Sequence, residues 1–197
     1  MCSSDLVNII ENEELASRIE SNFLKFHHEN GGLTFGVLKL SSTKILWYCQ
    51  FDITKHFINE DYTPDCIKQF MLDNFGGWNT LVSSIIEGSS YENAHIWRVY
   101  ELEKLNPFYH QNVVFIGDAA HPLIPFTSQG VTSALKDSFT LTNLLAEGND
   151  LQETFRKYEE DRKPEIETHI KNGRALLEQF LLPLNEQPKN TLPISYK

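Results

Sequence analysis

The spacing of apolar residues along the chain predicts a mixture of strands and helices. Two β-rich runs, at 33–40 and 44–53, flank the turn-prone segment 41–43 and predict a β-hairpin. A third run, at 96–102, is also predicted to be a strand. Between residues 5 and 28 the apolar positions lie mostly three or four apart, which indicates helical or mixed structure.

Two helices are predicted in the middle of the chain. The first begins after Thr63, because threonine caps a helix well and the proline that follows suits a first turn, and it ends at Gly76. The second is shorter, covers 79–87 and ends at Gly88. This region is therefore predicted to be two short helices separated by a glycine turn.

A continuous apolar run at 113–116 precedes a longer helix. Because the run does not alternate with polar residues, it predicts a strand covered on both faces, as in a parallel sheet. After a loop, apolar and small residues recur at helical spacing until Gly148. These residues are Val131, Ala134, Leu135, Ser138, Leu141, Leu144 and Leu145.

A second, highly charged helix is predicted at 151–172. Phe155, Tyr158 and Ile166 are predicted to face inward, and Pro164 is predicted to kink or divide the helix. From residue 183 onwards, prolines and polar residues predict a loose tail.

The composition indicates a globular protein and excludes some partners. The chain has 197 residues, of which 41% are hydrophobic, and its formal net charge is -10. This charge would repel nucleic acid and an anionic membrane surface. No apolar run reaches the roughly 18 residues that a membrane-spanning helix needs, and no signal-peptide pattern is present. We therefore expect no nucleic acid partner and no membrane partner.

The cysteines indicate a reducing compartment. Cys2, Cys49 and Cys66 are odd in number and far apart, with no CxxC pair, so the sequence predicts neither a disulfide framework nor a zinc site. Reduced thiols favour the cytoplasm. The oligomeric state is left open by the sequence.

The segment VVFIGDAAHPLIPFTSQGVTSALKDS carries the chemistry. Ligands of open α/β sheets lie beyond the carboxyl ends of the strands, which is where Gly117 and Asp118 stand. Gly117 allows a close backbone approach, Asp118 can accept hydrogen bonds from sugar-type hydroxyls, and Pro125 stiffens the loop. The helix that begins at 128–130 has free amide groups that favour an anion. An electron-rich or phosphate-bearing ligand is predicted.

The pattern GDAAHPLIPFTSQGVTSALKDS resembles the GDAAH signature of flavin-dependent aromatic hydroxylases and related monooxygenases. ILWYCQF resembles a strand of that family's substrate domain, and YEEDRKP, at 158–164, resembles its Tyr-x-x-x-Arg-x-Pro helix. The resemblance implies FAD as cofactor, NAD(P)H as co-substrate and a small organic, aromatic substrate to be hydroxylated. It implies no catalytic side chain and no metal, since the cofactor performs the chemistry. The implied cofactor-binding residues are Gly117, Asp118, Pro125, Ser128, Gln129, Gly130, Val131 and Thr132.

The chain departs from the family pattern at several points. Ser128 stands where the first glycine of Gly-Gln-Gly is usual, and Thr132 stands where asparagine is usual. No G-x-G-x-x-G and no Asp-Gly motif is present, although the family uses both. The resemblance therefore implies a truncated enzyme, its C-terminal portion, which we expect to be inactive alone.

The fold class implied is α/β, or an α+β fragment. It comprises the C-terminal part of an FAD-binding Rossmann-like domain and the remainder of a β-sheet substrate domain. The expected divisions are 1–105 for the substrate-domain sheet and helices, 106–150 for the strand, loop and helix of the FAD-binding domain, and 151–197 for the C-terminal helices and tail.

Other functions stay open at this point. A related FAD-dependent reductase, dehydrogenase or halogenase would share the GDAAH element, and a truncated fragment could be non-catalytic, because an unpaired strand would leave open edges and exposed apolar surface. His121 is expected to be structural, since no nucleophile accompanies it. Arg162 could reach the cofactor domain, but a solvated or helix-stabilising role is favoured.

Aromatic residues on the predicted strands also allow two interpretations, a substrate pocket or the hydrophobic core. Trp47, Tyr48 and Trp97 could line a substrate pocket, but core positions are favoured over a pocket.

Overall fold

The computed structural model describes residues 3–20, 23–58, 62–100 and 103–188. It divides into two compact units, one made of 1–99 with 180–187 and the other of 100–179 with 188–197. Cys2, the end of the strand predicted at 96–102 and residues 189–197 of the predicted tail lie outside the described residues. The expected division of the chain at residues 105 and 150 stays a prediction.

The first unit, called the sheet unit below, is built on an antiparallel sheet in the order β2-β3-β4-β1-β5. The predicted hairpin is confirmed as β3 and β4, in which Leu38 pairs with Leu46 and Leu33 with Phe51. The strands are β1 (Ser3–Glu11), β2 (Phe23–His27), β3 (Leu33–Lys39), β4 (Lys44–Asp52) and β5 (His95–Arg98).

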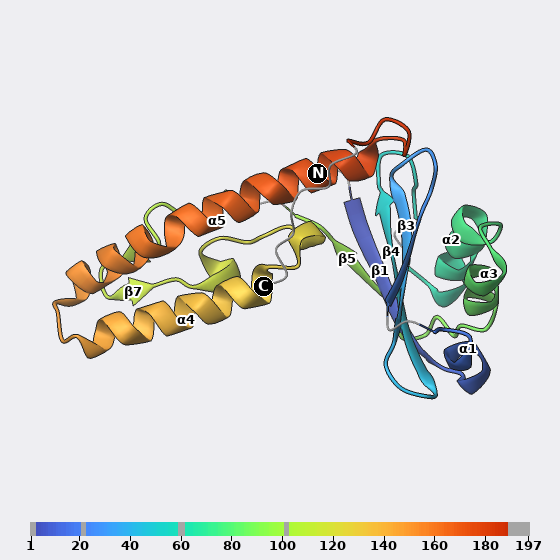
Figure 1. Ribbon diagram of the computed structural model, residues 1–197, viewed down its shortest axis with the longest axis horizontal. Helices are drawn as coiled ribbons and strands as arrows, with labels where there is room; N and C mark the ends of the chain where they lie inside the picture. Colours follow the sequence, from blue (N-terminus) through green and yellow to red (C-terminus); the bar gives the residue numbers. More distant parts are fainter. Residues whose placement is uncertain (1–2, 21–22, 59–61, 101–102, 189–197) are drawn as a thin grey trace. The chain divides into compact units, whose positions relative to one another are not determined.

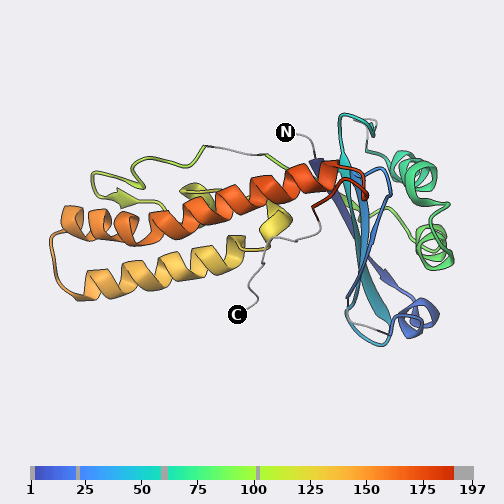
Figure 2. The same cartoon turned by 45° about the horizontal axis from the view of Figure 1, so that its top comes forward.

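Helices α2 (Pro64–Phe75) and α3 (Thr80–Glu87) lie against one face of this sheet, as Figure 1 and Figure 2 show. Both helices begin as predicted, since the side chains of Thr63 and Asn79 accept hydrogen bonds from backbone N–H groups of the first turn. Alternate strand residues face these helices and form the core, which buries Phe35, Trp47, Phe51, Met71 and Phe75 completely.

The aromatic strand residues divide between the two faces of the sheet. Trp47 belongs to the core, where its indole N–H donates to the Ser89 hydroxyl at 2.9 Å. Tyr48 is half-buried and Trp97 is 60% exposed. Because Tyr48 neighbours Trp47 in β4, its side chain lies on the opposite face of the sheet, called the helix-free face because α2 and α3 do not cover it. The core interpretation is therefore correct for Trp47 alone.

The beginning of the chain is a strand rather than a helix. Residues 5–28 were predicted to be helical or mixed, and they form β1, a short helix α1 (Glu13–Ser17) and β2. The helical interpretation is wrong for β1, where Leu6 and Ile10 are buried but Ile9 is 56% exposed. Leu6, Asn8 and Ile10 share one face with a period of two, and the polar Asn8 hid that period in the sequence.

The second unit, called the helical unit below, contains two long helices that lie side by side and antiparallel (Figure 1 and Figure 2). Its core includes Phe108, Leu144, Tyr158 and Ile166. Its elements are β6 (Tyr109–His110), β7 (Val113–Val114), the 3-10 turns η1 (Gly117–Ala119) and η2 (Pro125–Thr127), and the helices α4 (Gly130–Ala146) and α5 (Leu151–Leu181). The last residues of α5, from Phe180 on, are part of the sheet unit.

Two predictions for the helical unit are wrong. The run 113–116 is not a buried parallel strand: β7 covers only two residues and pairs antiparallel with β6, and Val113 is 54% exposed. The described residues supply no parallel neighbour, so nothing covers the run on both faces. Of the two effects expected of Pro164, the division of the helix is wrong, because α5 continues for 31 residues, and the kink stays a prediction. Phe155, Tyr158 and Ile166 are buried as predicted.

Helix α4 is oriented against its apolar pattern. Its length and its end near Gly148, which has a φ of 73°, are as predicted. The buried side chains, however, include Ser133 and Asp137, whereas Val131, Leu135 and Phe139 are exposed. In the first part of α4, polar residues therefore face the core of this unit and large apolar residues face away from it, whereas Leu144 near the end of the helix is part of the core.

Candidate functional site

The GDAAH segment folds into a tight turn that only glycine suits at its first position. Gly117 has a φ of 56°, in the left-handed region that L side chains rarely adopt. A Cβ atom on Gly117 would lie 3.0 Å from the Cβ of Ala134 on α4. The Gly117 carbonyl accepts hydrogen bonds from the amides of Ala120 and His121, both at 2.9 Å. The turn therefore presses directly against α4.

A groove of about 380 Å³ lies between this turn and the first half of α4. Asp118 is exposed and lines the groove on the side of the turn. Its carboxylate can accept hydrogen bonds from hydroxyl groups of a ligand. The residues lining the groove are Ile116, Gly117, Asp118, Gly130, Val131, Ala134, Leu135 and Ser138.

The amino end of α4 opens at this groove. The residue before the helix, Gln129, makes no side-chain capping hydrogen bond, and a Cβ on Gly130 would meet no heavy atom within 4 Å. The first amide groups of a helix have no partner within the helix and carry the positive end of its dipole. Since α4 has 17 residues, this end suits an anionic or electron-rich group.

The loop before α4 contains a residue in a glycine-like conformation. Ser128 has a φ of 54° and a ψ of 26°, in the left-handed region. Its N–H donates to the Pro125 carbonyl at 3.0 Å, which closes the η2 turn. The backbone at Ser128 thus follows a path that glycine adopts more easily, although the side chain is serine.

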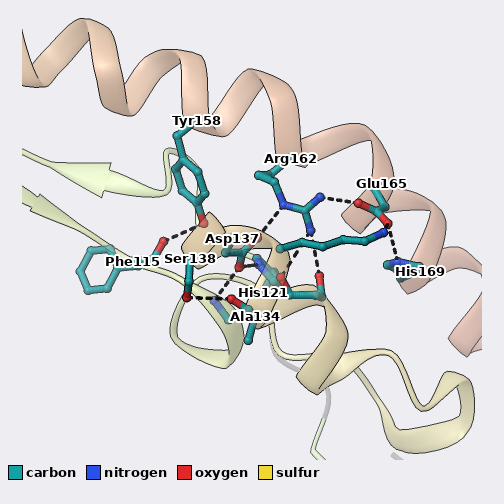
Figure 3. Close-up of polar contacts among 12 residues, drawn as sticks. Phe115, His121, Ala134, Asp137, Ser138, Tyr158, Arg162, Glu165 and His169 are labelled. Carbon is teal, nitrogen blue, oxygen red and sulfur yellow. Dashed lines mark hydrogen bonds and ion pairs between the residues drawn. The ribbon is translucent and has the colours of Figure 1, made fainter. Parts of the chain in front are cut away.

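A buried ionic network supports the turn from behind (Figure 3). Asp137 of α4 is 0% exposed. Its Oδ2 accepts from the Gly117 amide and lies 2.7 Å from Nε2 of His121, and its Oδ1 accepts from Nε of Arg162 at 2.7 Å. An ionised carboxylate only accepts hydrogen bonds, so Nε2 of His121 carries the hydrogen. One carboxylate therefore joins the turn, α4 and α5.

Arg162 extends this network along α5. It is 5% exposed, donates to the Ser133 hydroxyl at 3.2 Å and pairs with Glu165, which also pairs with Lys136 of α4. The solvated interpretation of Arg162 is therefore wrong, because its guanidinium group is buried beside the core of this unit.

The network keeps its carboxylates ionised. Burial alone would raise the pKa of Asp137, but the hydrogen bonds from His121, Arg162 and Gly117 outweigh it and lower this pKa to about 2. In the same way, burial would raise the pKa of Glu165, and the hydrogen bonds from Lys136 and Arg162 lower it to about 2. Asp137 is thus a charged group at neutral pH with three donors around it.

The structure brings together four of the eight predicted cofactor residues at the groove: Gly117, Asp118, Gly130 and Val131. The others, which are Pro125, Ser128, Gln129 and Thr132, belong to η2, the joint before α4 and its first turn. Asp137 and Ser133 were not predicted as site residues. Nothing in the sequence singled them out, because α4 also contains other polar residues, among them Thr132, Lys136 and Ser138.

The helix-free face of the sheet carries a second group of polar side chains. Gln50 accepts hydrogen bonds through its Oε1 from Lys25 Nζ at 3.2 Å and from the Thr34 hydroxyl at 3.3 Å. Asp5 lies opposite Gln50 on one side and Trp97 on the other. Its Oδ1 is buried and has no hydrogen-bond partner among the described residues.

Burial disfavours the charged forms of Asp5 and Lys25 on this face of the sheet. Desolvation raises the pKa of Asp5 to about 6, although a hydrogen bond from Gln50 and the charge of Lys25 act in the opposite direction. Desolvation also lowers the pKa of Lys25, and Asp5 partly offsets that change. Asp5 is therefore a carboxyl group whose charge changes near neutral pH.

Two kinds of feature are not found in the part of the chain that the structure describes. No group of three or more His, Cys, Asp and Glu side chains there could hold a metal ion. No helix within the described ranges is both long enough and apolar enough to cross a membrane.

Sequence comparisons place residues 3–172 within the family model of the FAD binding domain. Over 116 residues the chain is 32% identical to 3-amino-4-hydroxybenzoate 2-monooxygenase PtmB3 of Streptomyces platensis, covering 58% of this chain and 29% of the relative. Over 164 residues it is 25% identical to a salicylate hydroxylase of Pseudomonas putida, covering 80% of this chain and 35% of the relative. The chain thus spans about a third of the length of these relatives.

Solved structures share the fold at low sequence identity. The structure of Klebsiella pneumoniae HpxO complexed with FAD and uric acid matches 90% of this chain with a TM-score of 0.78 and 16% identity, and the match covers 44% of that protein. The structure of 2,6-dihydroxypyridine-3-hydroxylase from Arthrobacter nicotinovorans matches 98% of this chain with a TM-score of 0.76 and 12% identity. The mixed α/β fold is therefore shared with these two proteins, the first of which was solved with FAD bound.

Proposed function

Because the chain belongs to the FAD binding domain family, we propose that it supplies part of the FAD site of a monooxygenase that hydroxylates a small aromatic substrate. The observation that carries this proposal is the groove between Asp118 and the open amino end of α4. The curated relatives that are named monooxygenases and hydroxylases support the reaction class.

The residues present fit this cofactor. The turn at Gly117 leaves room for close approach because it has no side chain, and Asp118 offers a carboxylate for hydroxyl groups of the ribityl or ribose part. Gly130 and the first amide groups of α4 suit the pyrophosphate or the electron-rich edge of the isoalloxazine ring. Pro125, Ser128, Gln129, Val131 and Thr132 complete the proposed contact surface.

Bound FAD would supply the redox chemistry, accepting a hydride from NAD(P)H and activating molecular oxygen. The residues of this chain would bind and orient the cofactor, and the positive end of the α4 dipole would stabilise negative charge on it. No side chain of the groove needs to act as acid or base.

The test is FAD binding by this chain and by the longest protein that its gene locus encodes. Titration with FAD, followed by flavin fluorescence and absorbance, should show binding that Asp118→Ala weakens by at least about tenfold. Asp161→Ala is the matched control, because Asp161 is an exposed acid on α5. Absence of FAD binding by both proteins would contradict the proposal.

The reaction class has its own measurement. With NAD(P)H and oxygen, a monooxygenase gives a hydroxylated product from an aromatic substrate. Oxidation of NAD(P)H without any oxygenated product would instead indicate a reductase or dehydrogenase.

A further inference from the structure

Asp137 lies behind the ligand groove and does not line it, yet it contacts the turn that does. Its carboxylate binds the Gly117 amide, His121 and Arg162 at the same time. Building on the proposed FAD site, we infer that Asp137 is a positioning residue: it fixes the Gly117–Asp118 turn so that the Asp118 carboxylate lies at the groove. Arg162 and His121 in turn hold the Asp137 side chain in place.

The turn needs such a support because glycine has many accessible conformations. Gly117 occupies the left-handed region, and glycine adopts other conformations at little cost. Its carbonyl is bound by the amides of Ala120 and His121, whereas its own amide donates, within the described residues, to Asp137 alone. Asp137 therefore determines the orientation of the peptide group that precedes Gly117. Asp118 is the next residue, so its direction depends on this bond.

A carboxylate is required at this place, and its isosteric amide does not satisfy the same partners. Oδ2 of Asp137 accepts two hydrogen bonds, from Gly117 and His121, and Oδ1 accepts one from Arg162. Asparagine has one acceptor oxygen, so in either orientation its NH2 group would face a donor. The side chain is 0% exposed, and solvent cannot relieve this conflict.

Asp137→Asn tests the inference against a matched control. Leu144→Ala removes buried apolar volume from the same helix, and Leu144 neither lines the groove nor hydrogen-bonds the Gly117 amide. Both variants are compared with the unchanged protein at a temperature where all three are folded. FAD affinity should fall by about tenfold or more in Asp137→Asn and should change by less than about threefold in Leu144→Ala. Equal FAD affinity of Asp137→Asn and the unchanged protein would overturn the inference.

Hydrogen exchange of the Gly117 amide gives a second measurement that does not depend on FAD. This amide should be protected in the unchanged protein, should remain protected in Leu144→Ala, and should exchange on the order of 100-fold faster in Asp137→Asn. Equal acceleration in both variants would show a general loss of stability and would overturn the positioning role.

The two measurements separate the inference from the proposed function. If the unchanged protein binds no FAD but the Gly117 amide behaves as expected, the proposed function fails and the contact between Asp137 and the turn stands. If the unchanged protein binds FAD and Asp137→Asn binds it equally well, the proposed function stands and the positioning role fails.

Discussion

Asp5 of the sheet unit and Asp137 of the helical unit are both aspartates largely withdrawn from water, and their surroundings differ. Asp137 has three donors around its two oxygens and a pKa of about 2. Asp5 has one buried oxygen without a partner among the described residues, and burial raises its pKa to about 6. The comparison shows that the number of hydrogen-bond donors, more than burial itself, decides whether a carboxylate supports the fold.

The two residues therefore give opposite dependences of stability on pH. The pKa of Asp137 is lowered on folding, so its contribution is present above the unfolded value of about 3.8 and is lost as the pH falls towards 2. The pKa of Asp5 is raised on folding, so the folded protein binds a proton that the unfolded chain releases between about pH 4 and pH 6. Across that window Asp5 makes the protein less stable as the pH rises.

Removing the arginine partner of Asp137 should have the largest effect. Arg162→Met leaves the Asp137 carboxylate buried without its cation, and we expect the free energy of unfolding to fall by about 3–5 kcal/mol. Chemical denaturation at pH 7 measures this change. The double variant with Asp137→Asn should recover part of the loss, because the uncompensated charge is gone. A loss below about 1 kcal/mol would show that the guanidinium group is not the partner that matters.

Removing the charge of Asp5 should raise the free energy of unfolding, and by less than the loss of Arg162 lowers it. Asp5→Asn takes away a carboxylate that burial disfavours, so we expect the protein to gain about 1–3 kcal/mol at pH 7. The gain should shrink as the pH falls from about 6 to about 4, where Asp5 is protonated in the folded protein. Denaturation curves at both pH values test this. The exposed Asp161→Asn should change stability by less than about 0.5 kcal/mol at either pH.

The smallest expected effect comes from Lys25, whose charge attracts Asp5. Lys25→Met should raise the pKa of Asp5 further, because the attraction from Lys25 is lost while the burial of Asp5 is retained. We expect stability at pH 7 to fall by only a few tenths of a kcal/mol, because the attraction between Lys25 and Asp5 is partly offset by the desolvation of Lys25. An NMR titration of the Asp5 carboxyl group measures the shift. A lower pKa in the variant would refute the assignment of Lys25 as its partner.

The sequence predicted local structure well where the signal is local. Thr63 and Asn79 cap their helices, and the hairpin of β3 and β4 forms around its polar turn, because these choices depend on neighbouring residues. The apolar run at 113–116 was misinterpreted because a parallel strand needs neighbours from distant segments. That requirement cannot be read from the run itself.

The sequence predicted where the candidate site lies but did not predict the buried residues that support it. The groove lies where the GDAAH segment indicated, at Gly117, Asp118 and the start of α4. The buried partners Asp137 and Arg162 were not predicted, since charged side chains on helices are usually solvated. Their burial depends on the packing of α5 against α4, which joins residues 25 apart in the sequence.

The reversed orientation of α4 determines how this helix would respond to saturation mutagenesis. In the first part of this helix, positions that tolerate replacement without loss of folding should be the apolar ones: Ser133 and Asp137 would accept few replacements, whereas Leu135 and Phe139 would accept polar ones. A selection for folding alone and a selection for flavin binding would then tolerate different substitutions in α4. Val131 and Leu135 line the groove, so their replacement should be rejected only in the selection for flavin binding.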